Sequence, residues 1–139
     1  MRKGLTPDDL GDLLELPLLA VLATYRPDGT VLLSPVWHEW RDNGFQVVTG
    51  SRGAKTGHLR RDQRASIVVC EQGPPYRGIE VRGTARLGRL EDRSIVLRIA
   101  TRYLGPDAGE RYAESGGDDL LIRLEPGKLR AWDFADDFG

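Results

Sequence analysis

The chain has 139 residues, of which 40% are hydrophobic and 29% are charged, and its formal net charge is −1. This composition is typical of a globular protein and argues against a disordered chain, and the low net charge gives no general basic field for nucleic acid. The single cysteine, Cys70, excludes an intrachain disulfide and a thiolate metal cluster. Without a signal-peptide pattern or an apolar run near the roughly 20 residues that span a bilayer, we expect one cytoplasmic domain, residues 1–139.

The first predicted element is a short helix, followed by strands. Thr6 can cap the helix, Pro7 suits its first position, and Pro17 ends it. Turn sequences at 26–29 and 41–44 then separate three apolar runs. The runs predict an antiparallel meander of three strands, Leu19–Tyr25, Thr30–Trp40 and Phe45–Thr49.

The remaining chain alternates between predicted strands and helices. Helical segments are expected at 54–62, at 91–104, where Ile95 and Ile99 share one apolar stripe, and at 107–115. Cys70 lies in an apolar strand and is expected to be buried. The predicted strands are Ala65–Glu71, Gly78–Leu90, Leu120–Glu125 and Leu129–Phe134.

Together these elements predict an α+β protein that is mainly β. Six to seven strands in consecutive antiparallel order favour a closed or nearly closed barrel, and two to three helices flank it.

Basic residues are concentrated in the segment Gly50–Arg64, which directly follows a predicted strand. Its glycines allow a backbone to approach an anion closely, and the helix that begins there presents unpaired N–H groups. Thr49 and Ser51 add hydroxyl donors. The cations are Arg52, Lys55, His58, Arg60, Arg61 and Arg64. The segment therefore predicts a phosphate or carboxylate site; the alternative is a solvated basic face.

A second notable stretch, Ser34–Trp40, ends the second strand of the meander. Pro35 indicates an edge strand or a bulge, because proline donates no ladder hydrogen bond. Trp37 could lie along a planar ring, or it could be a core or interface aromatic. His38 and His58 lack metal-ligand spacing, which argues against zinc, and no nucleophile elbow is present.

At these two stretches the chain resembles the pyridoxamine 5′-phosphate oxidase-like split-barrel family, which binds flavin cofactors as a dimer. The resemblance rests on the order of LAVLATYRPDGT, LLSPVWHEW, FQVVTGSRGAKTGHLRRDQRASIVV, IEVRGTARL and LRAWDF. It is greatest to the branch that uses the deazaflavin coenzyme F420. The C-terminal substrate-binding arginine motif of the vitamin B6 oxidases is absent, so the resemblance does not extend to their reaction.

The resemblance implies a set of cofactor-binding residues. The strand around Ser34, Pro35, Val36 and Trp37 would lie along the ring. Val48 and Thr49 would flank the ribityl chain and phosphate. A further set would hold the anionic groups or lie near the partner's cofactor: Ser51, Arg52, Lys55, Arg60, Arg61 and Trp132.

The implied function is an F420-dependent reductase that transfers hydride to a small electron-poor acceptor. Its cofactor sites would lie at the interface of a homodimer, with no nucleic acid, membrane or metal involved. The alternatives are an FMN-dependent oxidoreductase of the same fold and a non-catalytic flavin- or haem-binding protein. Tyr76 and His38 are candidate proton donors.

Overall fold

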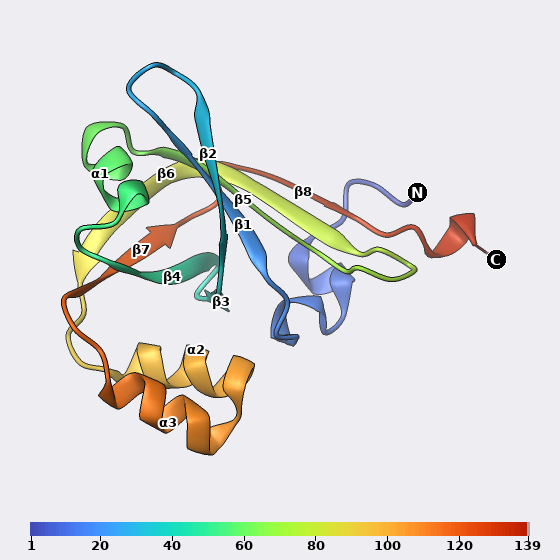
Figure 1. Ribbon diagram of the computed structural model, residues 1–139. Coiled ribbons are helices and arrows are strands. Elements are labelled where there is room, and N and C mark those ends of the chain that lie inside the picture. Colours follow the sequence, from blue (N-terminus) through green and yellow to red (C-terminus); the bar gives the residue numbers. More distant parts are fainter. Residues whose placement is uncertain (139) are drawn as a thin grey trace.

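The computed structural model describes residues 1–138 and is organised around one curled antiparallel sheet (Figure 1). Within these residues the sheet has eight strands, in the order β2-β1-β5-β6-β7-β4-β3, with β8 beside β6. The strands are β1 (Ala20–Tyr25), β2 (Val31–Val36), β3 (Glu39–Arg41), β4 (Gly44–Gly50), β5 (Arg64–Cys70), β6 (Gly78–Arg89), β7 (Asp119–Leu124) and β8 (Lys128–Trp132).

The long strand β6 connects the two halves of this half-barrel. Its first part pairs with β8, from Gly78 to Arg82, and its last part pairs with β7, from Ala85 to Arg89. Gly83 lies between the two parts, and a side chain there would clash with the carbonyl oxygen of Glu125 in the turn between β7 and β8. Glycine therefore allows one strand to serve both neighbours.

In the described part of the chain, three α-helices flank the sheet, namely α1 (Ala54–Arg61), α2 (Ser94–Leu104) and α3 (Pro106–Glu114). The α2–α3 hairpin lies at one end of the half-barrel, apart from α1 (Figure 1). The predicted N-terminal helix is instead two short 3-10 turns, η1 (Pro7–Leu10) and η2 (Leu13–Glu15), and a third, η3 (Ala135–Asp137), follows β8. Gly11 has φ of 62° between η1 and η2, and this left-handed residue interrupts the helix.

The predicted strand Thr30–Trp40 is broken at Trp37 and His38 into β2 and β3. The backbone N–H of His38 donates to the hydroxyl of Tyr103 in α2 instead of to a neighbouring strand. The break raises the strand count above the predicted six to seven. β2 is an edge strand, as expected from Pro35.

The apolar residues form two clusters. The larger fills the half-barrel, with Phe45 and Ile79 fully buried, and the smaller joins α2 and α3 to the sheet through Ile99 and Ala113. The expected burial of Cys70 is wrong: it is exposed, because Val69 takes the core-facing position at the end of β5 and the alternation turns Cys70 outward.

The predicted architecture, a mainly β split barrel with flanking helices, is confirmed. Among residues 1–138, no helix is long and apolar enough to cross a membrane.

Candidate functional site

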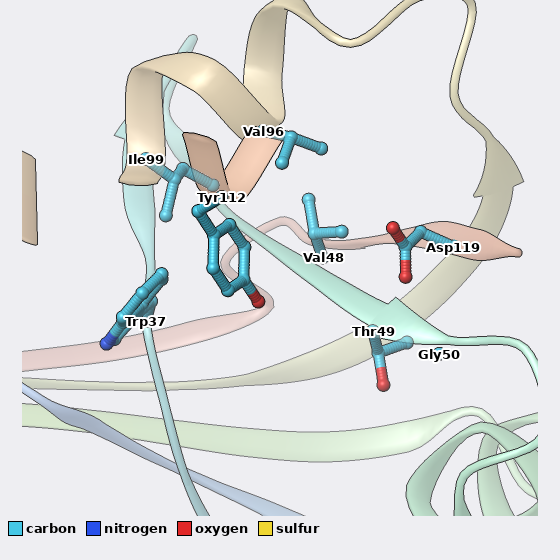
Figure 2. A pocket seen from close by; sticks show the side chains of 8 residues that line it. All are labelled: Trp37, Val48, Thr49, Gly50, Val96, Ile99, Tyr112 and Asp119. Atoms are coloured by element: carbon cyan, nitrogen blue, oxygen red, sulfur yellow. The ribbon is translucent and has the colours of Figure 1, made fainter. Parts of the chain in front are cut away.

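A pocket of about 100 Å³ opens between the end of β4 and the α2–α3 hairpin (Figure 2). One part of its wall is apolar and aromatic, and the other carries a hydroxyl, a backbone segment and a carboxylate. The lining residues are Trp37, Val48, Thr49, Gly50, Val96, Ile99, Tyr112 and Asp119. Three of the predicted cofactor residues, Trp37, Val48 and Thr49, therefore meet in one cavity.

The junction between β4 and α1 is held by hydrogen bonds to backbone oxygens. The Gly50 carbonyl accepts from the buried Thr56 hydroxyl at 2.8 Å and from the Gly53 N–H at 3.2 Å. The Ser51 N–H donates to the Asp118 carbonyl at 2.9 Å. These bonds fix where α1 begins. The N–H groups of its first turn have no helical acceptor, which gives this end a partial positive charge.

The cations around this helix fall into two kinds. Within residues 1–138, the side chains of Arg52, Lys55 and Arg60 make no hydrogen bond or ion pair. Arg61 differs, because its guanidinium donates to the Tyr25 carbonyl at 2.8 Å. The buried Leu59 anchors the helix on the half-barrel. Arg52 and Lys55, near the start of α1, are thus available to an anion.

Two carboxylates at the start of β7 lie beside this junction. Asp118 accepts a hydrogen bond from the Ser51 hydroxyl at 2.7 Å, so this predicted phosphate donor is already engaged. Asp119 lines the pocket and pairs directly with Gly50 across β4 and β7. Its Oδ2 accepts from Arg93 at 2.8 Å. The site therefore combines cationic, carboxylate and aromatic parts.

The aromatic wall is braced from behind by Tyr103. The Trp37 ring is stacked on the Tyr103 ring, with centroids 5.0 Å apart and planes within 8°. The Tyr112 ring also contacts the Trp37 ring, with centroids 5.0 Å apart and planes tilted by 52°. The Tyr103 hydroxyl donates to the Leu18 carbonyl at 2.7 Å and contacts the ring Nδ1 of His38 at 3.0 Å. These contacts fix Trp37 against α2.

Neither candidate proton donor lines the pocket. His38 is fully buried, and burial, with the nearby charge of Arg102, lowers its pKa from 6.5 to about 3. Its imidazole is therefore neutral near pH 7. Tyr76 contacts Phe138 near the C-terminal end, with ring centroids 5.8 Å apart. The hydroxyls that do reach the pocket belong to Thr49 and Tyr112.

The other predicted residues lie away from the pocket. Ser34 and Pro35 lie on the edge strand β2, and Val36 there is buried in the core. Trp132 is at the end of β8, opposite Gly78, with the Arg130 guanidinium 4.6 Å from the centre of its ring. Arg60 borders a different hollow, together with Arg89. No group of three potential metal-ligating residues occurs within residues 1–138.

Sequence reasoning missed half of the pocket wall. Val96 and Ile99 belong to the apolar stripe of α2. The stripe predicted that these side chains are buried, but it did not predict which part of the sheet they pack against. Tyr112 and Asp119 carried no motif. The one available signal for Asp119 was its place at the start of a strand that pairs with β4, and strand pairing was not predicted.

Comparisons with known proteins bear on the family and the fold of the chain. The family model described as pyridoxamine 5′-phosphate oxidase matches residues 6–133. No curated protein is significantly similar to the chain.

Several solved structures share the fold. A conserved hypothetical protein from Mycobacterium tuberculosis, Rv2991, has a TM-score of 0.76 at 24% identity, over 94% of this chain and 86% of that one. A protein named F420 reductase has a TM-score of 0.72 at 25% identity, over 89% and 98% of the two chains. A FAD-binding protein from Mesorhizobium loti has a TM-score of 0.66 at 19% identity, over 94% and 93%.

Proposed function

Because the chain belongs to the pyridoxamine 5′-phosphate oxidase family, we propose that it is an oxidoreductase that uses coenzyme F420. Its reaction is hydride transfer between the reduced deazaflavin and a small electron-poor organic acceptor. The observation that carries the proposal is the junction of β4 and α1. There, cations without a partner among residues 1–138 and the N–H groups of the first turn of α1 adjoin a pocket with an aromatic wall. The similarity to the solved F420 reductase supports the choice of cofactor.

The residues present fit a cofactor that has a phosphate and a planar ring. Lys55 and Arg52 can hold phosphate oxygens together with the first N–H groups of α1. The pocket, at about 100 Å³, is smaller than the roughly 300–1,000 Å³ of typical ligand sites, so most of a tricyclic ring must lie outside it. The neighbouring edge strand β2 offers unpaired backbone groups for the ring's heteroatoms.

A bound deazaflavin or flavin supplies the hydride chemistry, and the protein supplies position and surroundings. Trp37 and Tyr112 present aromatic surface that excludes water from one side of the site. The Tyr103 contacts hold Trp37 still, which keeps the bound ring in one orientation. The cations at the start of α1 fix the opposite, anionic end.

We include a homodimer in the proposal, with each cofactor site completed by the partner. The outward face of β1, β2 and β5 carries apolar residues on strands that pair side by side. Leu33 in β2 is 63% exposed, and Leu19, directly before β1, is 55% exposed. An exposed apolar face of this kind is typical of an interface between subunits. Trp132 lies on the same sheet, opposite Gly78, and in this proposal it lies near the partner's cofactor.

Cofactor titration tests this proposal. The purified protein is titrated with F420 and with FMN, following ligand fluorescence, and light scattering gives the mass of the complex. We expect micromolar F420 binding by a species of two chains, weaker FMN binding, and at least a tenfold loss of F420 affinity in Lys55→Ala. Lys3→Ala removes the same charge from the exposed N-terminus and serves as the control.

Each other outcome has a definite meaning. Tighter binding of FMN than of F420 assigns the protein to the flavin branch of the fold. Tight binding without reduction of any acceptor indicates a carrier or storage protein. Indifference to both cofactors overturns the proposal.

A further inference from the structure

We propose that Asp119, held by Arg93, is the residue that recognises the polyol chain of the cofactor, by accepting hydrogen bonds from its hydroxyl groups. This inference rests on the proposed function, because it assigns a role within the same site. Asp119 is a carboxylate next to the proposed phosphate site, and a carboxylate does not itself bind an anion.

The first argument is the order of chemical groups across the site. Trp37 and Tyr112 form the aromatic side of the pocket, and Thr49 and Asp119 lie on its polar side (Figure 2). Beyond Gly50 the chain turns directly into the start of α1, where the cations are. A ligand with a ring at one end and a phosphate at the other must therefore pass Asp119 with its middle part.

The second argument is that Asp119 is oriented. Arg93 donates to Asp119 Oδ2 at 2.8 Å, and the same guanidinium donates to the Ala113 carbonyl twice, at 3.2 Å. Arg93 is thereby fixed between α3 and β7, and it holds the carboxylate in one position. Within residues 1–138, Asp119 Oδ1 accepts no hydrogen bond, so one oxygen is left for a ligand.

The third argument is chemical. A carboxylate repels phosphate and offers little to an aromatic ring, but it is a strong acceptor for hydroxyl groups. The side chain of Asp119 is 23% exposed, and its partial burial strengthens such a bond relative to one in water. The Thr49 hydroxyl, on the same side of the pocket, can donate to or accept from a neighbouring hydroxyl. In a flavin or deazaflavin cofactor, the ribityl chain lies between the ring and the phosphate and carries several hydroxyl groups, so it matches this pair.

Paired ligands with and without the chain test the inference. Riboflavin is compared with lumiflavin, which carries a methyl group in place of the ribityl chain. In parallel, 8-hydroxy-5-deazariboflavin is compared with its N10-methyl analogue. Dissociation constants are measured by fluorescence for the wild-type protein, for Asp119→Asn and for Asp119→Ala. None of these ligands carries a phosphate, so the cations of α1 do not enter the comparison.

We expect Asp119→Ala to weaken binding of the ribityl ligands about tenfold and binding of the methyl ligands less than twofold. Asp119→Asn keeps the side-chain shape and one acceptor oxygen, and its loss is expected to be smaller. Asp107→Ala is the control, since Asp107 is exposed in the first turn of α3, away from the pocket. Circular dichroism and thermal melting establish that each variant is folded.

Two results would overturn the inference while leaving the proposed function in place. One is an equal loss of affinity for the ribityl and methyl ligands, which would assign Asp119 to the ring or to folding. The other is no loss for either ligand in a folded Asp119→Ala protein. If the wild-type protein binds F420 but none of the four phosphate-free ligands, the inference fails and the proposed function stands; if it binds neither these ligands nor F420 or FMN, both fail.

Discussion

Two groups of basic side chains in this protein have opposite surroundings. Arg77, Arg93 and Arg98 each donate to a carboxylate, and each joins segments that are distant in the sequence. Arg52 and Lys55, at the start of α1, have no such partner within residues 1–138. The difference separates cations that hold the fold together from cations that remain available to a ligand, and it is invisible in the sequence, where all five are simply basic residues.

Arg77 is the clearest member of the structural group. Its guanidinium forms two hydrogen bonds with Glu71, at 2.9 and 2.7 Å, and donates further to the Leu10 carbonyl and to Asp12. Through these contacts it ties the turn before β6 to the N-terminal 3-10 turns. The same hydrogen bonds lower the pKa of Glu71.

The largest expected effect is on stability, at Arg77. Arg77→Met should lower the free energy of unfolding by about 3 kcal/mol, because it leaves the half-buried Glu71 carboxylate unpaired. Lys55→Met should change it by less than about 0.5 kcal/mol while it weakens phosphate binding. Urea denaturation at one fixed protein concentration measures both. An equal loss of stability in the two variants would contradict the distinction between the groups.

Arg102 represents a third environment, a cation surrounded by neutral acceptors. It donates to the His38 carbonyl and, at 3.2 Å, to the Tyr103 hydroxyl. His38, beside it, is fully buried, and its ring Nε2 has no partner within the described part of the chain. Protonating this ring would place two positive charges next to each other in the interior.

The second prediction concerns pH. The folded protein keeps His38 neutral down to about pH 3, whereas the unfolded chain protonates it below its ordinary pKa of 6.5. The unfolded state therefore binds more protons between these values, and stability is lost as the pH falls below 6.5. We expect a loss of about 2 kcal/mol by pH 5, at no more than about 1.4 kcal/mol per pH unit.

His38→Asn isolates this contribution, because an amide keeps a polar atom near the position of Nδ1 but does not titrate. Urea denaturation from pH 7 to 4 should show a shallower loss of stability in the variant than in the wild type. Parallel curves for the two proteins would mean that His38 takes up no proton on unfolding in this range. The claim that burial and Arg102 keep His38 neutral in the folded protein would then be wrong.

The sequence predicted where the strands and helices lie along the chain better than it predicted which of them pair or pack together. Turn residues and alternation located the strands. The glycine-rich start of α1 predicted an anion site next to the end of β4, and this site stays a prediction. The break at Trp37–His38 was not predictable, because it depends on a hydrogen bond to Tyr103 in a remote helix. Asp119 and Tyr112 enter the pocket through long-range strand pairing and helix packing, and neither process leaves a local pattern.

The sequence carried least information about which basic side chains have a hydrogen-bond partner in the folded protein. Arg60 and Arg61 are adjacent and were both assigned to the anion site, yet the structure gives them different surroundings. Arg61 donates to the Tyr25 carbonyl at 2.8 Å, and Arg60 lies beside Arg89 at another hollow. Helical geometry turns adjacent side chains about 100° apart, so neighbours in sequence need not face the same ligand.

The smallest expected effects distinguish Arg60 from Arg61. Arg61→Gln should lower the free energy of unfolding by about 0.5–1 kcal/mol through the lost bond to Tyr25, with F420 affinity unchanged. Arg60→Gln should leave stability unchanged and weaken F420 binding about two- to threefold at low salt, an effect that disappears at high salt because an exposed charge is screened. The phosphate-free 8-hydroxy-5-deazariboflavin should not distinguish Arg60→Gln from the wild type. If it does, Arg60 acts through the position of α1 and not through its charge, and the available cations are reduced to Arg52 and Lys55.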